Sequence, residues 1–491
     1  MNKKFLSVLF SMSFLLLFGK ALGFIRTAMV ASTYGAGFVS DIYSFEDSLI
    51  NEIYAIFSTF LACSFIPKYL SLEAHKRNRL FNLLLNCGIA IMALLTVFCL
   101  VFTKSLLRLL VPGYFELYDI SQIIFITRIN LIMLILTFLV NYIMIVLQTY
   151  EIFIYLSLES VILNVVVIGY LLAMPNAGIL GLLSCRIVAY LILLILVTTK
   201  LKRSTPLKYK LYLNPRDKDF VDMVRLSLPM LCITVLWQLN YVIDKSMASE
   251  LKSGSVACLN YANVISMIIY NVIGYIVSTY AYPIMSKIQS DEYRISNTFR
   301  EYFLILLKLV LPISILTMFF AEYASNLLYG HGNMSAGSII TIANILIMYL
   351  PGSIAYCIKN LYSKLFYIKK NTKIVLGLDI AGCMANIILN FILVNFMGVY
   401  GLALATSISY CVTVVLQIIF ANKKGYTNLE LNDLRHTIVY VIALSAIGFV
   451  TSYALKQFIN DETIKFIYVS MVYLIVCGLF GFKDLKQVVN T

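Results

Sequence analysis

Two cations stand inside the first apolar run of this chain, which is long enough to cross a membrane. They are Lys20 and Arg26. The next apolar run carries four acids, which are Asp41, Glu46, Asp47 and Glu52. A cation at the centre of a bilayer costs about 2.5–3.5 kcal/mol even on lenient insertion scales, so it usually faces a protein interior or a wet cavity. Two adjacent spans with this much charge predict the wall of a polar cavity.

The spacing of these residues limits what they can contact together. Lys20 and Arg26 are six positions apart, so on a helix they point about 120° away from each other. Gly19 and Gly23 lie four positions apart beside them, which permits either a close helix approach or local bending. The two cations therefore cannot both contact one small group unless the helix is kinked.

The acids of the second run have two interpretations. Asp41 and Glu52 are eleven positions apart and fall on nearly the same helix face, whereas Glu46 and Asp47 face elsewhere. Buried cations need counter-ions, so Asp41 or Glu46 could simply neutralise Lys20 or Arg26. Alternatively, the acids take part in gating or in binding a coupling ion. The sequence leaves both interpretations open.

Other spans carry polar candidates of the same kind. Arg128, Arg186 and Asn164 are candidate substrate ligands, and Asp379 is a candidate for ion coupling. Glu159 is a further intramembrane acid without an assigned role. Three more cations lie nearer to span ends, where we expect them to extend toward the membrane surface: Arg225, Lys308 and Lys359.

The chain lacks the signatures of an enzyme of the soluble type. None of its three histidines has an acidic or nucleophilic partner at useful spacing, and there is no phosphate-binding P-loop. The ten cysteines show neither metal-ligand spacing nor a disulfide framework. We therefore predict a protein that is not an enzyme and that needs no cofactor and no metal.

Composition identifies the class of protein. The 491 residues are 61% hydrophobic and only 13% charged, whereas soluble domains carry about 25% charged residues. The first apolar run continues through Lys20 and Arg26 without a small-residue cleavage site, so we expect it to be a span rather than a removed signal peptide. The net charge of +14 fits the positive-inside bias of membrane proteins better than nucleic-acid binding.

Apolar runs of about 20 residues predict an all-α protein with about fourteen spans. They lie near 5–31, 39–65, 80–103, 121–148, 152–174, 178–199, 221–243, 256–286, 299–321, 337–363, 373–395, 399–422, 433–455 and 465–482. With a cytoplasmic N-terminus, 25 of the 38 Lys and Arg residues fall in inner loops and tails, six in outer loops and seven within spans. This asymmetry predicts that both termini are cytoplasmic.

A weak internal repeat predicts two lobes. Ala31-Ser32, Gly37 and Val39 recur 217 residues later as Ala248-Ser249, Gly254 and Val256. A duplicated unit with an even number of spans gives a parallel repeat of the kind found in two-lobed transporters. We expect a six-helix lobe at 1–199, a basic cytoplasmic linker at 200–220, a second six-helix lobe at 221–422 and two further spans within 433–482.

Two stretches resemble a known family. Residues 22–41 are similar to the first-span signature of the MurJ/MviN lipid flippases, with Leu-Gly-Phe-x-Arg, a small-residue turn and then Asp41. Residues 243–264 resemble the family's segment between spans seven and eight. Pro67 after the second span and Pro112-Gly113 after the third match as well.

The resemblance implies a member of the multidrug/oligosaccharidyl-lipid/polysaccharide exporter superfamily in the bacterial inner membrane. It would flip a polyprenyl-diphosphate-linked saccharide, with the peptidoglycan precursor lipid II as the usual cargo. Lys20 and Arg26 occupy the family's first-span cation positions. The sequence departs where the family has further arginines, reading Tyr54 in span two and Val264 after Tyr261-Ala262.

The cargo and the driving force stay open at this point. Alternatives are a flippase for another undecaprenyl-linked glycan, such as an O-antigen or capsule unit, and a cation-coupled drug exporter of the same superfamily. We expect the partners to be the lipid-linked substrate and membrane lipids, and we expect a monomer. The coupling ion is not identified by the sequence.

Overall fold

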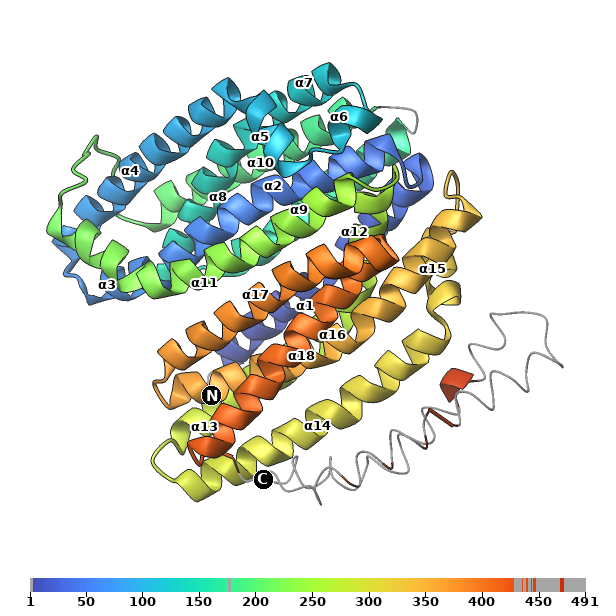
Figure 1. Ribbon diagram of the computed structural model, residues 1–491. Coiled ribbons are helices and arrows are strands. Elements are labelled where there is room, and N and C mark those ends of the chain that lie inside the picture. The colour runs from blue at the N-terminus through green and yellow to red at the C-terminus, as the bar shows by residue number, and fades with distance from the viewer. Residues whose placement is uncertain are drawn as a thin grey trace. The chain divides into compact units, whose positions relative to one another are not determined.

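The computed structural model describes residues 3–174 and 178–427, together with a few isolated positions further along the chain. Within these ranges every regular element is a helix, as predicted (Figure 1). The elements are α1 (Lys3–Tyr34), α2 (Phe38–Phe60), η1 (Leu61–Phe65), α3 (Ile66–Ser71), α4 (Ala74–Val101), α5 (Thr103–Leu110), α6 (Tyr114–Leu117), α7 (Ile120–Asn130), α8 (Ile132–Thr149), α9 (Ile154–Ala173), α10 (Ile179–Ser204), α11 (Lys218–Ser249), α12 (Ser255–Ile269), η2 (Tyr270–Gly274), α13 (Tyr275–Lys287), α14 (Glu292–Phe319), α15 (Ala321–Tyr329), α16 (Ala336–Ile368), α17 (Thr372–Met397) and α18 (Val399–Lys423).

Eleven segments of the described chain are long and apolar enough to cross a membrane. A twelfth is α11, which bends by 56° between Leu228 and Met230, where the sequence has a proline. These twelve segments correspond to the first twelve predicted spans. The last two predicted spans, near 433–455 and 465–482, lie outside the described residues.

The chain divides into two compact units. The first comprises Met1–Ala257 with His331–Ser335, and the second comprises Cys258–Gly330 with Ala336–Thr491. Within the first unit α2 packs against α8, α10 and α11, and α1 packs against α9. Within the second, α16 packs against both α13 and α18, and α17 against α18.

The helix boundaries repeat along the chain. α14, α15 and α17 begin 218 residues after α4, α5 and α9 respectively, and α12 begins 217 residues after α2. Both α2 and α12 run into a short π-helical turn, η1 and η2. This internal correspondence of elements agrees with the repeat predicted from Ala31-Ser32 and Ala248-Ser249.

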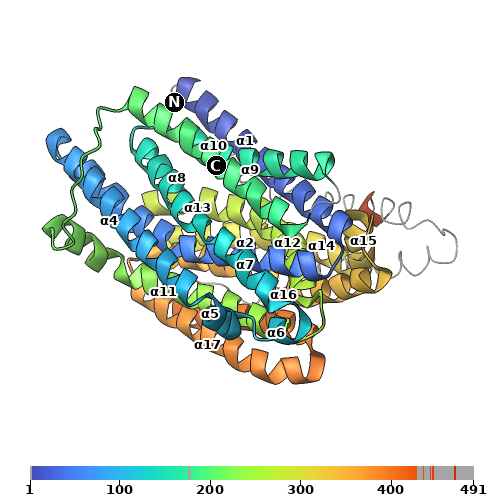
Figure 2. The same ribbon diagram turned by 90° about the horizontal axis from the view of Figure 1, so that it is seen from above.

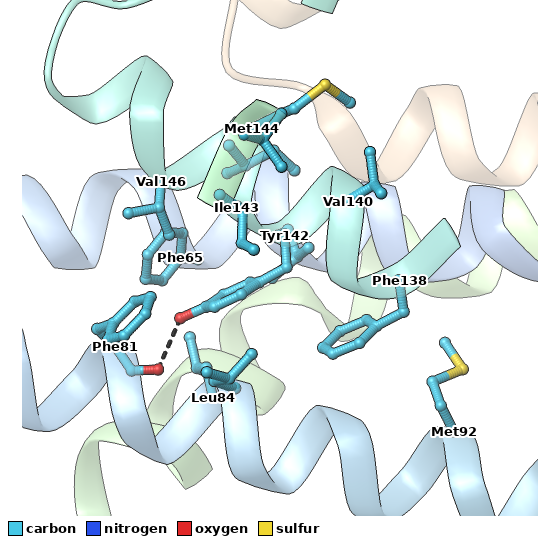
Figure 3. Packing of buried hydrophobic residues seen from close by; sticks show 14 of the residues in the cluster. Phe65, Phe81, Leu84, Met92, Phe138, Val140, Tyr142, Ile143, Met144 and Val146 are labelled. Atoms are coloured by element: carbon cyan, nitrogen blue, oxygen red, sulfur yellow. Dashed lines mark hydrogen bonds between the residues drawn. The ribbon is translucent and has the colours of Figure 1, made fainter. Parts of the chain in front are cut away.

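The core of the first unit is built from aromatic and branched side chains of α2, η1, α4 and α8. Tyr142 is fully buried between Phe81 and Phe138, with ring centroids 5.8 Å from each, and its hydroxyl donates to the Phe81 carbonyl at 2.8 Å (Figure 3). A buried phenol needs such a partner, because an unpaired polar group in an apolar interior is costly. This packing fixes α4 and α8 beside α2, which carries the acidic residues.

Candidate functional site

Each of the four acids of helix α2 binds a different neighbouring element. Because the acids are spaced five, one and five positions apart, they point in three directions around the helix, with Asp41 and Glu52 on nearly the same face. Each carboxylate of Asp41, Glu46, Asp47 and Glu52 is bound by groups from a different helix or turn. The polar wall predicted from the sequence is therefore organised around α2.

The Arg186 centre lies where α1, α2 and α10 meet, and we define it as Arg26, Tyr43, Asp47, Arg186 and Tyr190. The Arg186 side chain is 1% exposed, and its Nη2 lies 2.7 Å from Oδ1 of Asp47, which is 24% exposed. Asp47 also interacts electrostatically with Arg26, as do the Tyr43 and Tyr190 hydroxyls. Two guanidinium groups thus share the Asp47 carboxylate, and Arg186 also interacts electrostatically with Glu46.

Both arginines keep hydrogen-bond donors to spare. Among the described residues, Nε of Arg26 and Nε and Nη1 of Arg186 are buried and have no hydrogen-bond partner. Unpaired buried donors cost free energy, and each guanidinium N–H prefers an anionic acceptor. An oxyanion is the kind of group that such donors would bind.

Glu159 adjoins this centre without neutralising it directly. Its Oε1 accepts a hydrogen bond from the Tyr190 hydroxyl at 2.8 Å and a longer one from Nδ2 of Asn141 at 3.4 Å. Tyr190 thereby connects the Glu159 carboxylate on α9 to the arginines of the Arg186 centre. The acid supports the orientation of α10, which presents Arg186.

Asp41 holds the first turn of α12. Its Oδ2 accepts from the backbone N–H of Gly254 at 2.6 Å, and its Oδ1 accepts from the N–H of Ala257 at 2.8 Å. A carboxylate at this place satisfies donors that a helix start leaves unpaired, and it complements the positive end of the helix dipole. Gly254 has φ +87°, and a Cβ there would come within 2.5 Å of the Ala36 carbonyl oxygen, so the turn requires glycine.

Tyr118, in the connection after α6, completes the binding of Asp41. Its hydroxyl donates to Oδ2 of Asp41 at 2.7 Å and accepts from the Ser253 hydroxyl at 2.7 Å. Burial, and then the negative charge of Asp41, raise the pKa of Tyr118, so the phenol remains a donor. We call the set of Asp41, Tyr118, Ser253, Gly254 and Ala257 the Asp41 latch.

Glu46 is fully buried against α7. Asn130 donates to its Oε2 at 2.6 Å and to its backbone carbonyl at 3.0 Å, and Thr127 donates to Oε1. Asn130 is the last residue of α7, at the break before α8. Glu46 therefore fixes the α7–α8 break, and its carboxylate is occupied by neutral donors rather than by Lys20 or Arg26.

Glu52 pairs with Lys245, a cation that is not among the predicted site residues. Its Oε1 lies 2.7 Å from Nζ of Lys245 on α11, and the two side chains are 13% and 19% exposed. Asp41 and Glu52 thus bind α11 and the following turn, as expected for residues on one face of α2. Lys245 brings a cation to the same helix turn as Tyr54, where the family resemblance led us to expect an arginine.

Asn164 and the two glycines of α1 join α1 to α9. Nδ2 of Asn164 donates to the Gly19 carbonyl at 3.0 Å, and a Cβ on Gly23 would lie 3.3 Å from that nitrogen. A Cβ on Gly19 would lie 3.0 Å from Ser160. Since α1 is continuous through this region, the glycines serve close approach of the helices here. Lys20 is exposed on the same helix.

The remaining predicted site residues lie elsewhere. Arg128 is exposed near the end of α7. Asp379 is buried on α17 in the second unit, 2.8 Å from Nζ of Lys359 on α16. The expectation that Lys359 extends to the membrane surface was wrong. α16 continues to Ile368, and Lys359 is buried between the rings of Tyr356 and Tyr410, 5.8 Å from each centroid.

The structure therefore brings together Arg26, Arg186 and Asp47, and it disperses the other candidates. The contributions of Tyr43, Tyr118, Tyr190 and Lys245 were missed. Tyr43 lies four positions before Asp47 and Tyr190 four positions after Arg186, a helical spacing that could have indicated both tyrosines. The partners of Tyr118 and Lys245 are distant in the chain, so no spacing could reveal these two residues.

Comparison with known proteins gives a consistent result. The profile of the family described as "Lipid II flippase MurJ" matches residues 30–477. A probable lipid II flippase MurJ of Borreliella burgdorferi is 22% identical over 479 residues, which cover 94% of this chain and 92% of the relative. Another, from Rickettsia prowazekii, is 23% identical and covers 85% of this chain and 84% of the relative.

Solved structures show the same fold. The inward closed conformation of a lipid II flippase MurJ superposes with a TM-score of 0.84 at 19% identity, covering 97% of this chain and 99% of that one. An inward-facing multidrug-resistance MATE transporter superposes with a TM-score of 0.70 at 13% identity, covering 83% and 94%. At these identities the likeness concerns the fold.

Proposed function

Because this chain belongs to the lipid II flippase MurJ family, we propose that it carries lipid II from the inner to the outer face of the bacterial cytoplasmic membrane. The cargo is a polyprenyl diphosphate linked to a saccharide. Neither the diphosphate nor the sugars can cross hydrocarbon unaided, so the carrier must offer cations and hydrogen-bond donors inside the membrane.

The Arg186 centre is the observation that supports this proposal most strongly. Arg26 and Arg186 have three buried guanidinium N–H nitrogens without partners among the described residues, next to the partly exposed Asp47. A diphosphate supplies several oxygens that accept from planar guanidinium forks. We assign the diphosphate to these two arginines and a peripheral contact to the exposed Lys20, about 9 Å along α1 from Arg26.

The acids of α2 suggest how the carrier closes. In the Asp41 latch, α2 and the first turn of α12 are held by two backbone donors and one phenol. We assign gating to this latch, and to the Glu52–Lys245 pair further along the same face of α2. Glu46 then stabilises the break between α7 and α8, and Asp47 balances the charge of Arg26 and Arg186.

The wider cycle follows from the repeat. We propose that lobes at 1–199 and 221–422, joined by the linker 200–220, alternate access to the cavity in the manner of other two-lobed transporters. Asp379 has a cationic partner in Lys359. A role of Asp379 in ion coupling therefore requires that this pair open during the cycle.

Replacement of the resident flippase in a cell that depends on it tests the cargo. Cells depleted of their own lipid II flippase would express this chain, and lipid II at the outer face would be measured by its accessibility to an externally added enzyme or probe. We expect restored exposure. Normal expression without restored exposure would refute lipid II as the cargo.

A parallel experiment distinguishes the alternative cargo. Cells that lack a flippase for an undecaprenyl-linked O-antigen unit would receive the same gene, and surface antigen would be measured. We expect no restoration there, because the proposal assigns recognition to lipid II rather than to any polyprenyl-linked glycan.

A further inference from the structure

The segment between α10 and α11 is held along α4 by a ladder of asparagines. We call residues 205–217 the strap. Figures 1 and 2 show it leaving α10, passing beside the start of α4 and reaching α11. The rungs are Asn78, Asn82 and Asn86, four residues apart on one face of α4. Side chains at this spacing follow one another up a helix, so they form a straight row.

The row matches the repeat of an extended chain. Asn78 and Asn82 accept from the backbone N–H groups of Lys208 and Lys210 at 2.8 and 2.7 Å. Asn82 and Asn86 donate to the carbonyls of the same two residues at 2.9 and 3.0 Å. Four helical residues rise about 6 Å and two strand residues about 6.6 Å, so successive rungs meet alternate strap residues. The ladder thus fixes the strap as a strand-like segment with one face outward.

The outward side chains are apolar and basic. Leu211 and Leu213 are 81% and 56% exposed, which is high for large apolar side chains. Tyr209 is 63% exposed, but its hydroxyl turns back to α4 and donates to Oδ1 of Asn86 at 3.1 Å. Exposed cations accompany them at Lys202, Arg203, Lys208, Lys210, Arg216 and Lys218. Two nearby acids are already paired, Asp217 with Arg79 and Asp219 with Lys68 at 2.8 Å.

The length of α4 places this surface relative to a bilayer. α4 has 28 residues, about 42 Å, whereas the hydrocarbon core is about 30 Å thick. Counted from Ala74, the remaining length of about 12 Å ends at Asn82, so Asn78 and Asn82 lie at headgroup depth and Asn86 about 6 Å deeper. The strap lies along this part of the helix, on the side predicted to be cytoplasmic.

We propose that the strap binds the surface of an anionic-lipid bilayer, with Leu211 and Leu213 at the headgroup–acyl boundary and the lysines on lipid phosphates. Apolar side chains alternating with cations suit that interface, because it offers hydrocarbon and negative charge within a few ångströms. If the strap bound a soluble protein instead, these leucines would face water whenever that partner was absent. The assignment does not depend on which cargo the protein carries.

A single-tryptophan probe tests the proposal on the full chain. Trp237 is the only tryptophan, so Leu211→Trp in a Trp237→Phe background reports on the strap alone. The protein would be reconstituted in vesicles in which either phosphatidylglycerol or phosphatidylcholine carries brominated acyl chains. The ratio of quenching by the two lipids measures the preference for anionic lipid at the strap.

We expect stronger quenching by brominated phosphatidylglycerol, and a preference that decreases with salt. Lys208→Gln with Lys210→Gln should reduce the preference by about fivefold for each lysine removed. The matched control, Lys104→Gln with Lys252→Gln, removes two exposed cations elsewhere and should leave it unchanged. Asn82→Ala, which removes a central rung, should also reduce it.

Two outcomes would overturn the proposal. Equal quenching by both brominated lipids would show that the strap contacts lipid without recognising its charge. Quenching by aqueous acrylamide instead of brominated lipid would show that the strap faces water, as a protein-docking surface would.

Discussion

Replacing Asp41 by alanine should release the first turn of α12. The wild-type carboxylate accepts from two backbone N–H groups, at 2.6 and 2.8 Å, and from the Tyr118 hydroxyl at 2.7 Å. Hydrogen bonds to a charged group contribute about 1.5–3 kcal/mol each, and water regains part of that when the turn opens. We estimate a loss of about 2–4 kcal/mol in the opening free energy of this turn, from the two amide bonds.

Hydrogen–deuterium exchange of the peptide covering residues 251–260 measures this opening directly. A loss of 2–4 kcal/mol corresponds to exchange that is about 30-fold to about 1,000-fold faster. Tyr118→Phe removes one bond to the carboxylate and should give a smaller acceleration. Glu116→Ala, an exposed acid of α6, is the matched control. Unchanged exchange in Asp41→Ala would refute the view that Asp41 holds α12.

The remaining predictions concern stability and pH. Gly254→Ala should lower the melting temperature of the purified protein, since φ is +87° and Ala36 leaves no room for a Cβ, whereas Gly337→Ala, with no atom within 4 Å, should not. Asp47→Asn should destabilise by about 3–5 kcal/mol because Arg186 stays buried without its anion, and adding Arg186→Gln should recover part of that loss in the same melting assay. Burial alone would raise the pKa of Asp217, but hydrogen bonds from Arg79 and Tyr212 outweigh it and lower the pKa. The stability from Asp217 is thus complete above its unfolded pKa of about 3.9 and disappears as the pH falls through the lower folded value, so Asp217→Asn should differ from wild type at neutral pH and converge with it in acid.

The fold was largely predictable because membrane spans can be recognised from the local composition of the sequence. Runs of about 20 apolar residues located twelve of the described spans, and the repeat around Ala31 and Ala248 located the corresponding helices. The predicted span 337–363 ended five residues before α16 does, and Lys359 was wrongly expected to reach the membrane surface. Hydropathy alone cannot distinguish a lysine that reaches water from one that pairs with Asp379 on another helix.

The sequence predicted which types of residue form the candidate site, but not which of them contact one another. The charges of α1 and α2 were evident, and the shared face of Asp41 and Glu52 followed from helical spacing. Which groups they bind depended on contacts between residues some 140 to 220 positions apart, as with Asp47–Arg186 and Asp41–Ala257. One sequence carries no record of such contacts.

The central claim is that Arg26 and Arg186 hold the diphosphate of the cargo. Binding of lipid II to purified Arg26→Ala measures this most directly, because Arg26 can be removed while the Arg186–Asp47 pair remains. We predict an affinity about 10- to 100-fold lower than wild type, partly restored in Arg26→Lys, and unchanged in the exposed control Arg128→Ala. Equal affinity of Arg26→Ala and Arg128→Ala for lipid II, with both proteins folded, would contradict the account.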